Sequence, residues 1–86
     1  MSETIIYSKP SCPYCVRAKE ILSEQGISYR EVSFGQPGFE SKQQLQESIG
    51  AVVNTVPQIV LNGTYIGGCD KLAAHFGVPV FPAKAQ

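Results

Sequence analysis

The sequence predicts one α/β domain with a four-stranded mixed sheet and helices on both of its faces. Three observations lead to this prediction. Short β-branched and aliphatic runs alternate with segments of helical periodicity, an Asn-Gly pair separates the last two apolar runs, and a glycine follows each helical segment. The expected order is therefore strand, helix, strand, helix, strand, strand, helix.

The first half of the chain has the pattern of a strand, a helix and a second strand. Residues 4–7 form a short apolar run with β-branched members, which is typical of a strand. Residues 14–25 carry apolar side chains at helical spacing, and Gly26 provides the stop. Residues 28–32 alternate as a second strand. This βαβ unit predicts two parallel strands with a right-handed crossover.

The second half adds a helix and a β-hairpin. Residues 40–49 are polar with a few apolar side chains on one side, as expected of an amphipathic helix. Residues 58–61 and 64–66 have the composition of strands. Asn62-Gly63 between them is a strong signal for a two-residue hairpin turn.

The last helix is expected over residues 69–76. We expect residues 77–86 to form an irregular tail, because two prolines in that segment forbid a helix. Val80 and Phe81 are expected to pack on the sheet face.

Length and composition limit the class of protein. The 86 residues, 43% of them hydrophobic, suffice for one small core, so residues 1–86 are expected to form a single domain. Seven basic and seven acidic residues give zero formal net charge, which argues against nucleic acid or an anionic membrane as partner. The chain has no apolar run long enough to span a bilayer and no signal-peptide pattern at its start. We therefore expect a cytoplasmic monomer, whose three cysteines serve catalytic or transient disulfides.

The segment Cys12-Pro13-Tyr14-Cys15 places two cysteines at a strand-to-helix turn. The thiolate is the reactive form of a cysteine, and the unpaired N–H groups at a helix start favour negative charge. This spacing also brings the second sulfur within bonding reach of the first. We therefore predict a redox dithiol in which Cys12 attacks and Cys15 resolves the intermediate.

Three other uses of this cysteine pair stay open. A zinc site would need two further ligands, and the remaining candidates, Cys69 and His75, match no familiar spacing, so we expect no metal. A structural disulfide would close too short a loop to stabilise the fold much. A chance pair of buried cysteines suits the polar, proline-containing surroundings poorly.

Two further motifs follow the dithiol. The full set is Cys12-Pro13-Tyr14-Cys15 after Lys9, Thr55-Val56-Pro57-Gln58, and Ile66-Gly67-Gly68-Cys69-Asp70. In this order and near this spacing, the three motifs resemble those of the small dithiol glutaredoxins, which have a thioredoxin-like fold. The resemblance covers about residues 4–76. It implies a glutathione-dependent thiol-disulfide oxidoreductase.

The resemblance also implies a glutathione site at the second motif. In glutaredoxins the bond before the proline of this motif is cis and faces the dithiol, so Thr55, Val56 and Pro57 would flank the cysteinyl part of glutathione. The residues alone leave another interpretation open, in which Pro57 is an ordinary trans proline at the first position of a strand.

The remaining site residues come from the same resemblance. The backbone of Cys69 and the carboxylate of Asp70 would hold the γ-glutamyl end of glutathione. Lys9 would offer positive charge to the glycine carboxylate and to the Cys12 thiolate. Tyr14 would line one side of the groove. The alternatives are a helix-capping Asp70, a solvated Lys9 and a Tyr14 ring half-buried in its helix. If the Cys69 thiol is exposed, it could be glutathionylated under oxidative stress.

One departure from the family lies in the middle helix. Many glutaredoxins carry a basic residue near its C-terminal end that helps to hold the glycine carboxylate. This chain has no basic residue over residues 43–48, where Gln43 or Gln46 could donate a hydrogen bond instead. Without a charged partner for the glycine carboxylate, we expect glutathione to bind more weakly.

The implied reaction uses glutathione as reductant and needs no tightly bound cofactor. Its substrates would be protein-glutathione mixed disulfides and protein disulfides, with ribonucleotide reductase as one candidate partner by family analogy. Two alternatives stay open. One is a thioredoxin-like electron donor reduced by a flavoprotein reductase. The other is a carrier of a [2Fe-2S] cluster held by two Cys12 thiolates and two glutathiones, which Pro13 disfavours.

Overall fold

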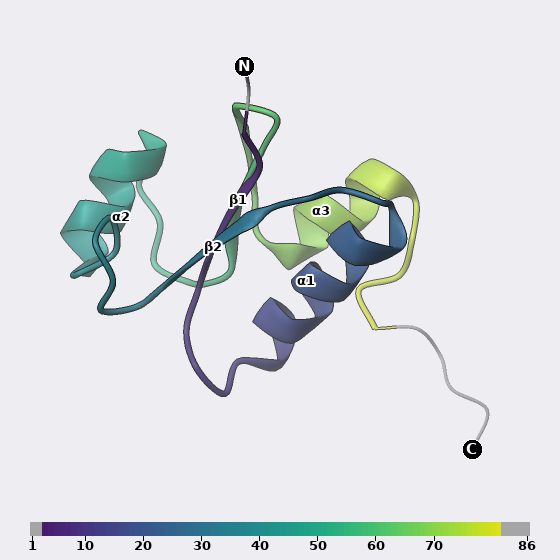
Figure 1. Cartoon of the computed structure of the whole chain (residues 1–86), viewed down its shortest axis with the longest axis horizontal. Helices are drawn as coiled ribbons and strands as arrows, with labels where there is room; N and C mark the ends of the chain where they lie inside the picture. The colour runs from purple at the N-terminus through teal and green to yellow at the C-terminus, as the bar shows by residue number, and fades with distance from the viewer. Residues whose placement is uncertain (1–2, 82–86) are drawn as a thin grey trace.

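Four short strands form one mixed sheet in the order β2-β1-β3-β4. The structure is a computed structural model that describes residues 3–81. The strands are β1 (Ile5–Ser8), β2 (Arg30–Ser33), β3 (Gln58–Leu61) and β4 (Thr64–Gly67). β1 runs parallel to β2 and antiparallel to β3, and β3 runs antiparallel to β4 (Figure 1). The predicted mixed sheet is confirmed.

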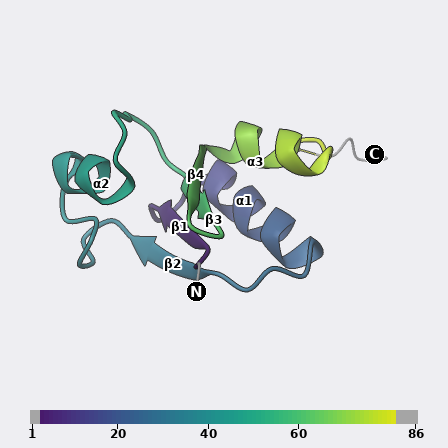
Figure 2. The ribbon, with the colours of Figure 1, turned by 90° about the horizontal axis from the view of Figure 1, so that it is seen from above.

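Three helices cover the sheet. They are α1 (Pro13–Glu24), α2 (Lys42–Ile49) and α3 (Cys69–Phe76). Seen from above, α1 and α3 lie together on one side of the sheet and α2 lies on the other, as the sequence predicts (Figure 2). Within residues 3–81, no helix is long and apolar enough to cross a membrane.

Alternation along the central strands divides the apolar side chains into two clusters. Ile6 is fully buried against α1 and α3, whereas its neighbour Tyr7 packs in the cluster on the α2 side. In the same way Ile59 belongs to the first cluster and Val60 packs against the second. Successive side chains of a strand point to opposite faces, so one strand serves both cores. The first cluster comprises Ile6, Ala18, Ile21, Leu22, Ile59, Leu61, Cys69, Leu72 and Ala73, and we call it the α1–α3 core.

The turn and strand boundaries follow local chemistry. Asn62 and Gly63 both have positive φ, 50° and 85°, which is the conformation that a two-residue hairpin turn requires. β2 begins at Arg30, two residues later than expected. The residues before it, Ile27 and Tyr29, pack against the α1–α3 core while the pairing with β1 starts at Arg30.

The C-terminal segment differs from the expectation. Residues 77–81 are irregular, as predicted, and the rest of the expected tail, residues 82–86, lies outside the described residues. Val80 packs against the α1–α3 core, but the expected packing of Phe81 on the sheet face is wrong. Phe81 is half-exposed and lies against Tyr14, with ring centroids 5.0 Å apart. α1 and α3 already cover this face of the sheet, so the segment reaches only the edge of the helices.

Ile59→Ala is expected to lower the free energy of unfolding by about 2–5 kcal/mol, because Ile59 is fully buried and the shorter side chain leaves a cavity. Urea denaturation measures this loss. Val52→Ala is the control, since Val52 is 87% exposed and its truncation is expected to change stability by less than about 0.5 kcal/mol. Equal losses in the two variants would contradict the place of Ile59 in the core.

Candidate active site

Cys12 is the N-cap residue of α1, so its sulfur lies at the start of the helix. Its backbone is extended, Pro13 follows as the first helical residue, and the Cys15 N–H donates a hydrogen bond to Cys12 Sγ at 3.3 Å. A side chain that accepts from a free N–H of the first turn stabilises the helix start. The same N–H groups and the helix dipole favour an anion at this position. The Cys12 sulfur is partly exposed and suited to act as a nucleophile.

Cys15 lies one turn further along α1, where it is only 1% exposed. Burial first, and then the hydrogen bond with Cys12, raise the pKa of the Cys15 thiol to about 12. All three cysteines of the chain are free thiols in this structure. The pair is therefore asymmetric: the Cys12 sulfur is accessible, and the Cys15 thiol keeps its proton at neutral pH.

The sheet topology brings three loops to one end of the sheet. α1 begins after the carboxyl end of β1, and the antiparallel β3 starts beside it, preceded by Val56 and Pro57. β4 runs back to the same end, where α3 begins. The Val56–Pro57 bond is cis, as the resemblance implies. Pro57 lies directly before β3, which begins at Gln58, so it is not the first residue of the strand. The Val56 carbonyl oxygen lies 3.9 Å from Cys12 Sγ.

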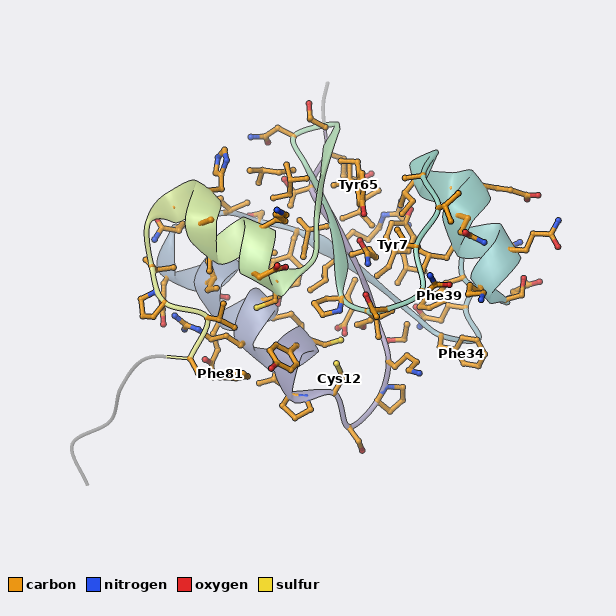
Figure 3. The ribbon with its side chains drawn as sticks, turned by 180° about the vertical axis from the view of Figure 1, so that it is seen from behind. Tyr7, Cys12, Phe34, Phe39, Tyr65 and Phe81 are labelled. Carbon is orange, nitrogen blue, oxygen red and sulfur yellow. The ribbon has the colours of Figure 1, made fainter. Side chains whose placement is uncertain are left out.

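A groove of about 520 Å³ lies where these loops meet. Six residues named from the sequence line it, namely Tyr14, Thr55, Val56, Pro57, Cys69 and Asp70, together with Gly68, Val80 and Phe81. Figure 3 shows Cys12 and Phe81 at the same end of the molecule, close to the start of α1. The structure thus brings the second and third sequence motifs together beside the dithiol.

The start of α3 forms one end of this groove. Gly68 is its N-cap residue and no side chain caps the helix, so the alternative in which Asp70 caps its own helix is wrong. Asp70 is exposed in the first turn and lines the groove. A Cβ atom at Gly68 would lie 3.2 Å from the Pro57 carbonyl oxygen, so the glycine allows α3 to approach the proline closely.

Cys69 contributes backbone to the groove while its side chain belongs to the α1–α3 core. The residue is 3% exposed, and burial raises the pKa of its thiol. The condition for its glutathionylation, an exposed thiol, is therefore not met.

A second, smaller cavity of about 140 Å³ adjoins the groove and shares Thr55 and Val56 with it. Lys9 lines this cavity, not the groove, and so does Lys42 at the start of α2. The Lys42 ammonium donates a hydrogen bond to Asn54 Oδ1 at 3.2 Å. Sequence reasoning missed Lys42 because it sought a basic residue near the other end of the helix. Lys42, in the first turn and the only basic residue of the helix, was the available signal.

The two glutamines expected to replace a basic residue point elsewhere. Gln46 Oε1 accepts a hydrogen bond from the Val53 N–H at 3.1 Å, and Gln43 donates to the Glu47 carboxylate at 3.4 Å. Neither glutamine lines the groove or the smaller cavity. The expectation that one of them faces the ligand is wrong, since both satisfy polar groups of α2 and the loop after it.

Comparisons with known proteins decide the family. Residues 4–66 match the family model for glutaredoxin. The chain is 40% identical over 75 residues to a glutaredoxin of Pseudomonas aeruginosa, an alignment that covers 86% of this chain and 84% of that protein. The chain belongs to the glutaredoxin family. It is a thiol-disulfide oxidoreductase by this membership.

Further relatives agree with the assignment of this glutaredoxin. Glutaredoxin 3 of Escherichia coli is 40% identical over 74 residues, with 86% of each chain covered. The crystal structure of glutaredoxin 1 from Francisella tularensis superposes with a TM-score of 0.72 at 30% identity, over 90% of this chain and 94% of that one. The thioredoxin-like fold expected from the sequence is therefore confirmed.

Native alkylation tests the asymmetry of the cysteines. Iodoacetamide near neutral pH is expected to label Cys12 alone, because the Cys15 and Cys69 thiols are buried and burial raises their pKa values. In guanidinium chloride all three should be labelled. Peptide mapping by mass spectrometry measures the sites, and Cys12→Ser should leave the native chain unlabelled. Equal labelling of Cys12 and Cys15 in the native protein would contradict the burial described here.

Proposed function

We propose that this glutaredoxin reduces protein-glutathione mixed disulfides and protein disulfides at the expense of glutathione, with Cys12 as nucleophile and Cys15 as resolving thiol. One observation carries the proposal. A single groove runs from the Val56 backbone beside the Cys12 sulfur to a carboxylate and free N–H groups at the start of α3. Its two ends match the thiol and the γ-glutamyl end of glutathione.

The groove and the adjoining cavity offer complementary charge to each end of glutathione. At the α3 end, backbone N–H groups can receive the γ-glutamyl carboxylate, and the Asp70 carboxylate can receive the ammonium group. The Val56 backbone lies beside the Cys12 sulfur, where the cysteinyl part would bind. The cavity shared through Thr55 and Val56 holds Lys9 and Lys42, two cations for the glycine carboxylate.

In the route for mixed disulfides, the Cys12 thiolate attacks the glutathione sulfur of the substrate. The Cys12–glutathione disulfide forms, the substrate S–S bond breaks, and the protein thiolate leaves and takes up a proton. A second glutathione thiolate then attacks the glutathione sulfur of that intermediate. Cys12 is released as thiolate and oxidised glutathione departs. Cys15 takes no part in this route.

In the route for protein disulfides, Cys12 first forms a mixed disulfide with the substrate. Cys15 then loses its proton, attacks the Cys12 sulfur and displaces the second substrate thiolate, which leaves a Cys12–Cys15 disulfide. Two glutathiones reopen it. Because burial raises the pKa of the Cys15 thiol, its proton must pass to another group as it attacks, and the departing substrate thiolate can take it.

The proposed partners are glutathione and glutathionylated or disulfide-bonded proteins, ribonucleotide reductase among them by family analogy. A reducing compartment such as the cytoplasm suits three free thiols. We also propose that the protein is a monomer and needs no tightly bound cofactor.

Turnover of a glutathionylated peptide with glutathione, NADPH and glutathione reductase tests the proposal. Cys12→Ser should reduce the rate to background, because it removes the nucleophile, and Cys15→Ser should retain activity. With a protein disulfide as substrate, Cys15→Ser should lose activity as well. A wild type that fails with glutathione but accepts electrons from thioredoxin reductase would instead be a thioredoxin-like donor.

Loss of one charge at the α3 end of the groove or in the adjoining cavity should weaken glutathione binding selectively. Asp70→Asn and Lys42→Gln are each expected to raise the glutathione concentration at half-maximal rate about three- to tenfold with little change in kcat. Steady-state kinetics with varied glutathione measures this change. Arg30→Gln is the control, because Arg30 is exposed and pairs with Glu3 outside both cavities. Equal effects in all three variants would contradict the assigned contacts.

A further inference from the structure

Arg17, in α1, is a charged residue whose side chain is almost completely buried. Its side chain is 4% exposed. Nε donates to the Val80 carbonyl oxygen at 2.6 Å, and Nη2 donates to the Pro79 carbonyl oxygen at 3.1 Å. Nη1 lies 3.4 Å from the Glu20 carboxylate and 3.3 Å from that of Glu24. The guanidinium therefore joins α1 to residues 78–81, which we call the C-terminal strap.

The strap has few other polar contacts. The Val78 N–H bonds to the Ala73 carbonyl oxygen at 2.9 Å where the chain leaves α3. Beyond that point the described residues of the strap form neither helix nor strand, and Pro79 has no N–H to donate. Val78 and Val80 pack against the α1–α3 core. Two carbonyl oxygens on one guanidinium are thus the polar contacts that fix the course of the strap just before Phe81.

At the end of the strap, Phe81 packs against Tyr14, which follows Cys12 by two residues in α1. Its ring packs on Tyr14, with centroids 5.0 Å apart and planes inclined by 56°. Phe81 lines the groove that contains Pro57, and it also lines a wider hollow of about 950 Å³ along α1 that begins at Pro13. The ring therefore lies between the proposed glutathione site and the hollow along α1, at the end of the molecule where Figure 3 also shows Cys12.

Phe81 is one of three exposed apolar side chains here, and the hollow it lines also carries five charged residues, Arg17, Lys19, Glu20, Glu24 and Glu31. Phe81, Tyr14 and Val16 are 50%, 52% and 51% exposed, and all three flank the start of α1 where Cys12 lies. Val16 and Phe81 line the same hollow. In the proposed reaction, one half of a mixed disulfide occupies the groove, so the other half extends from Cys12 outside it, and this surface adjoins the groove through Phe81. An apolar side chain next to the substrate cysteine would bury the exposed ring faces.

We propose that Phe81 is a specificity-determining residue and that Arg17 is the positioning residue that holds it in place. The pair selects polypeptide disulfides with an aromatic or large aliphatic residue next to the reacting cysteine. This inference rests on the proposed function for the course of the substrate, and it adds the substrate class. Arg17 also lines the hollow along α1, and its assigned role is to act on Phe81 through the strap.

Single-turnover reduction of two peptide disulfides tests the specificity. The peptides differ only in a phenylalanine or a serine beside the cysteine, and the pre-reduced protein supplies both electrons as Cys12 and Cys15 form their disulfide. No glutathione is added, so failure of the glutathione proposal would not affect the result. The wild type is expected to react about five- to tenfold faster with the phenylalanine peptide. Phe81→Ala should lower this ratio to below about twofold.

The role of Arg17 requires a combination of variants. Arg17→Gln should lower the ratio as Phe81→Ala does, and it should lower it no further when Phe81→Ala is already present. Arg30→Gln, which removes an exposed guanidinium from a distant ion pair, should retain the wild-type ratio. If Arg17→Gln slows both peptides equally and the ratio persists, its role is structural only and the inference fails. A wild type with no preference, or a preference kept by Phe81→Ala, would overturn it as well.

Tryptophan fluorescence can report the position of the strap in the absence of any reaction. The chain has no tryptophan, so Phe81→Trp provides a single reporter. Adding Arg17→Gln should shift its emission to longer wavelength and raise its quenching by acrylamide, because the ring leaves Tyr14 for water. Unchanged emission and quenching would show that Arg17 does not hold this position. Phe81→Ala removes half-exposed atoms only, so the peptide comparison remains decisive even if Arg17→Gln does not fold.

Discussion

The site depends on one hydrogen bond, from the Cys15 N–H to Cys12 Sγ at 3.3 Å. Most helices begin with a hydroxyl, carboxamide or carboxylate as cap, and here a sulfur takes that place. The same atom thus stabilises the start of α1 and is the proposed nucleophile. Ser11, with φ of 61°, turns the chain between β1 and the helix so that this sulfur can face its own first turn. Nucleophile and helix start are therefore set by the same local conformation.

The sheet holds the rest of the site in place. Its strands alternate in direction from β1 to β3 to β4, which brings the dithiol, the cis Val56–Pro57 segment and the start of α3 to the same end. The dithiol loop follows β1 and the cis segment precedes β3, and both strands have buried residues, so these two loops rest on a rigid support. Gly68 completes the arrangement, because a larger residue would push α3 away from the Pro57 carbonyl.

The sequence predicts those features that depend on local chemistry. Periodicity, glycines and Asn62-Gly63 predict the order of the elements, and the spacing of the cysteines predicts the dithiol. The cis bond at Pro57 required the family resemblance, since X-Pro bonds are usually trans. The partners of Arg17 and the orientation of Gln46 depend on contacts with distant loops. No periodicity along one helix can indicate which carbonyl a buried guanidinium meets.

β1 can pair with its neighbours in one register only, because Ile6 faces one core while Ile5 and Tyr7 face the other. A slip of one residue would turn Ile6 to the α2 side and Tyr7 to the α1–α3 side, so both cores would fail at once. The slip would also shift Cys12 away from Val56, since α1 follows directly from this strand. A misregistered chain is thus poorly packed and lacks the proximity of Cys12 and Val56. The register that buries both cores is also the register that assembles the groove.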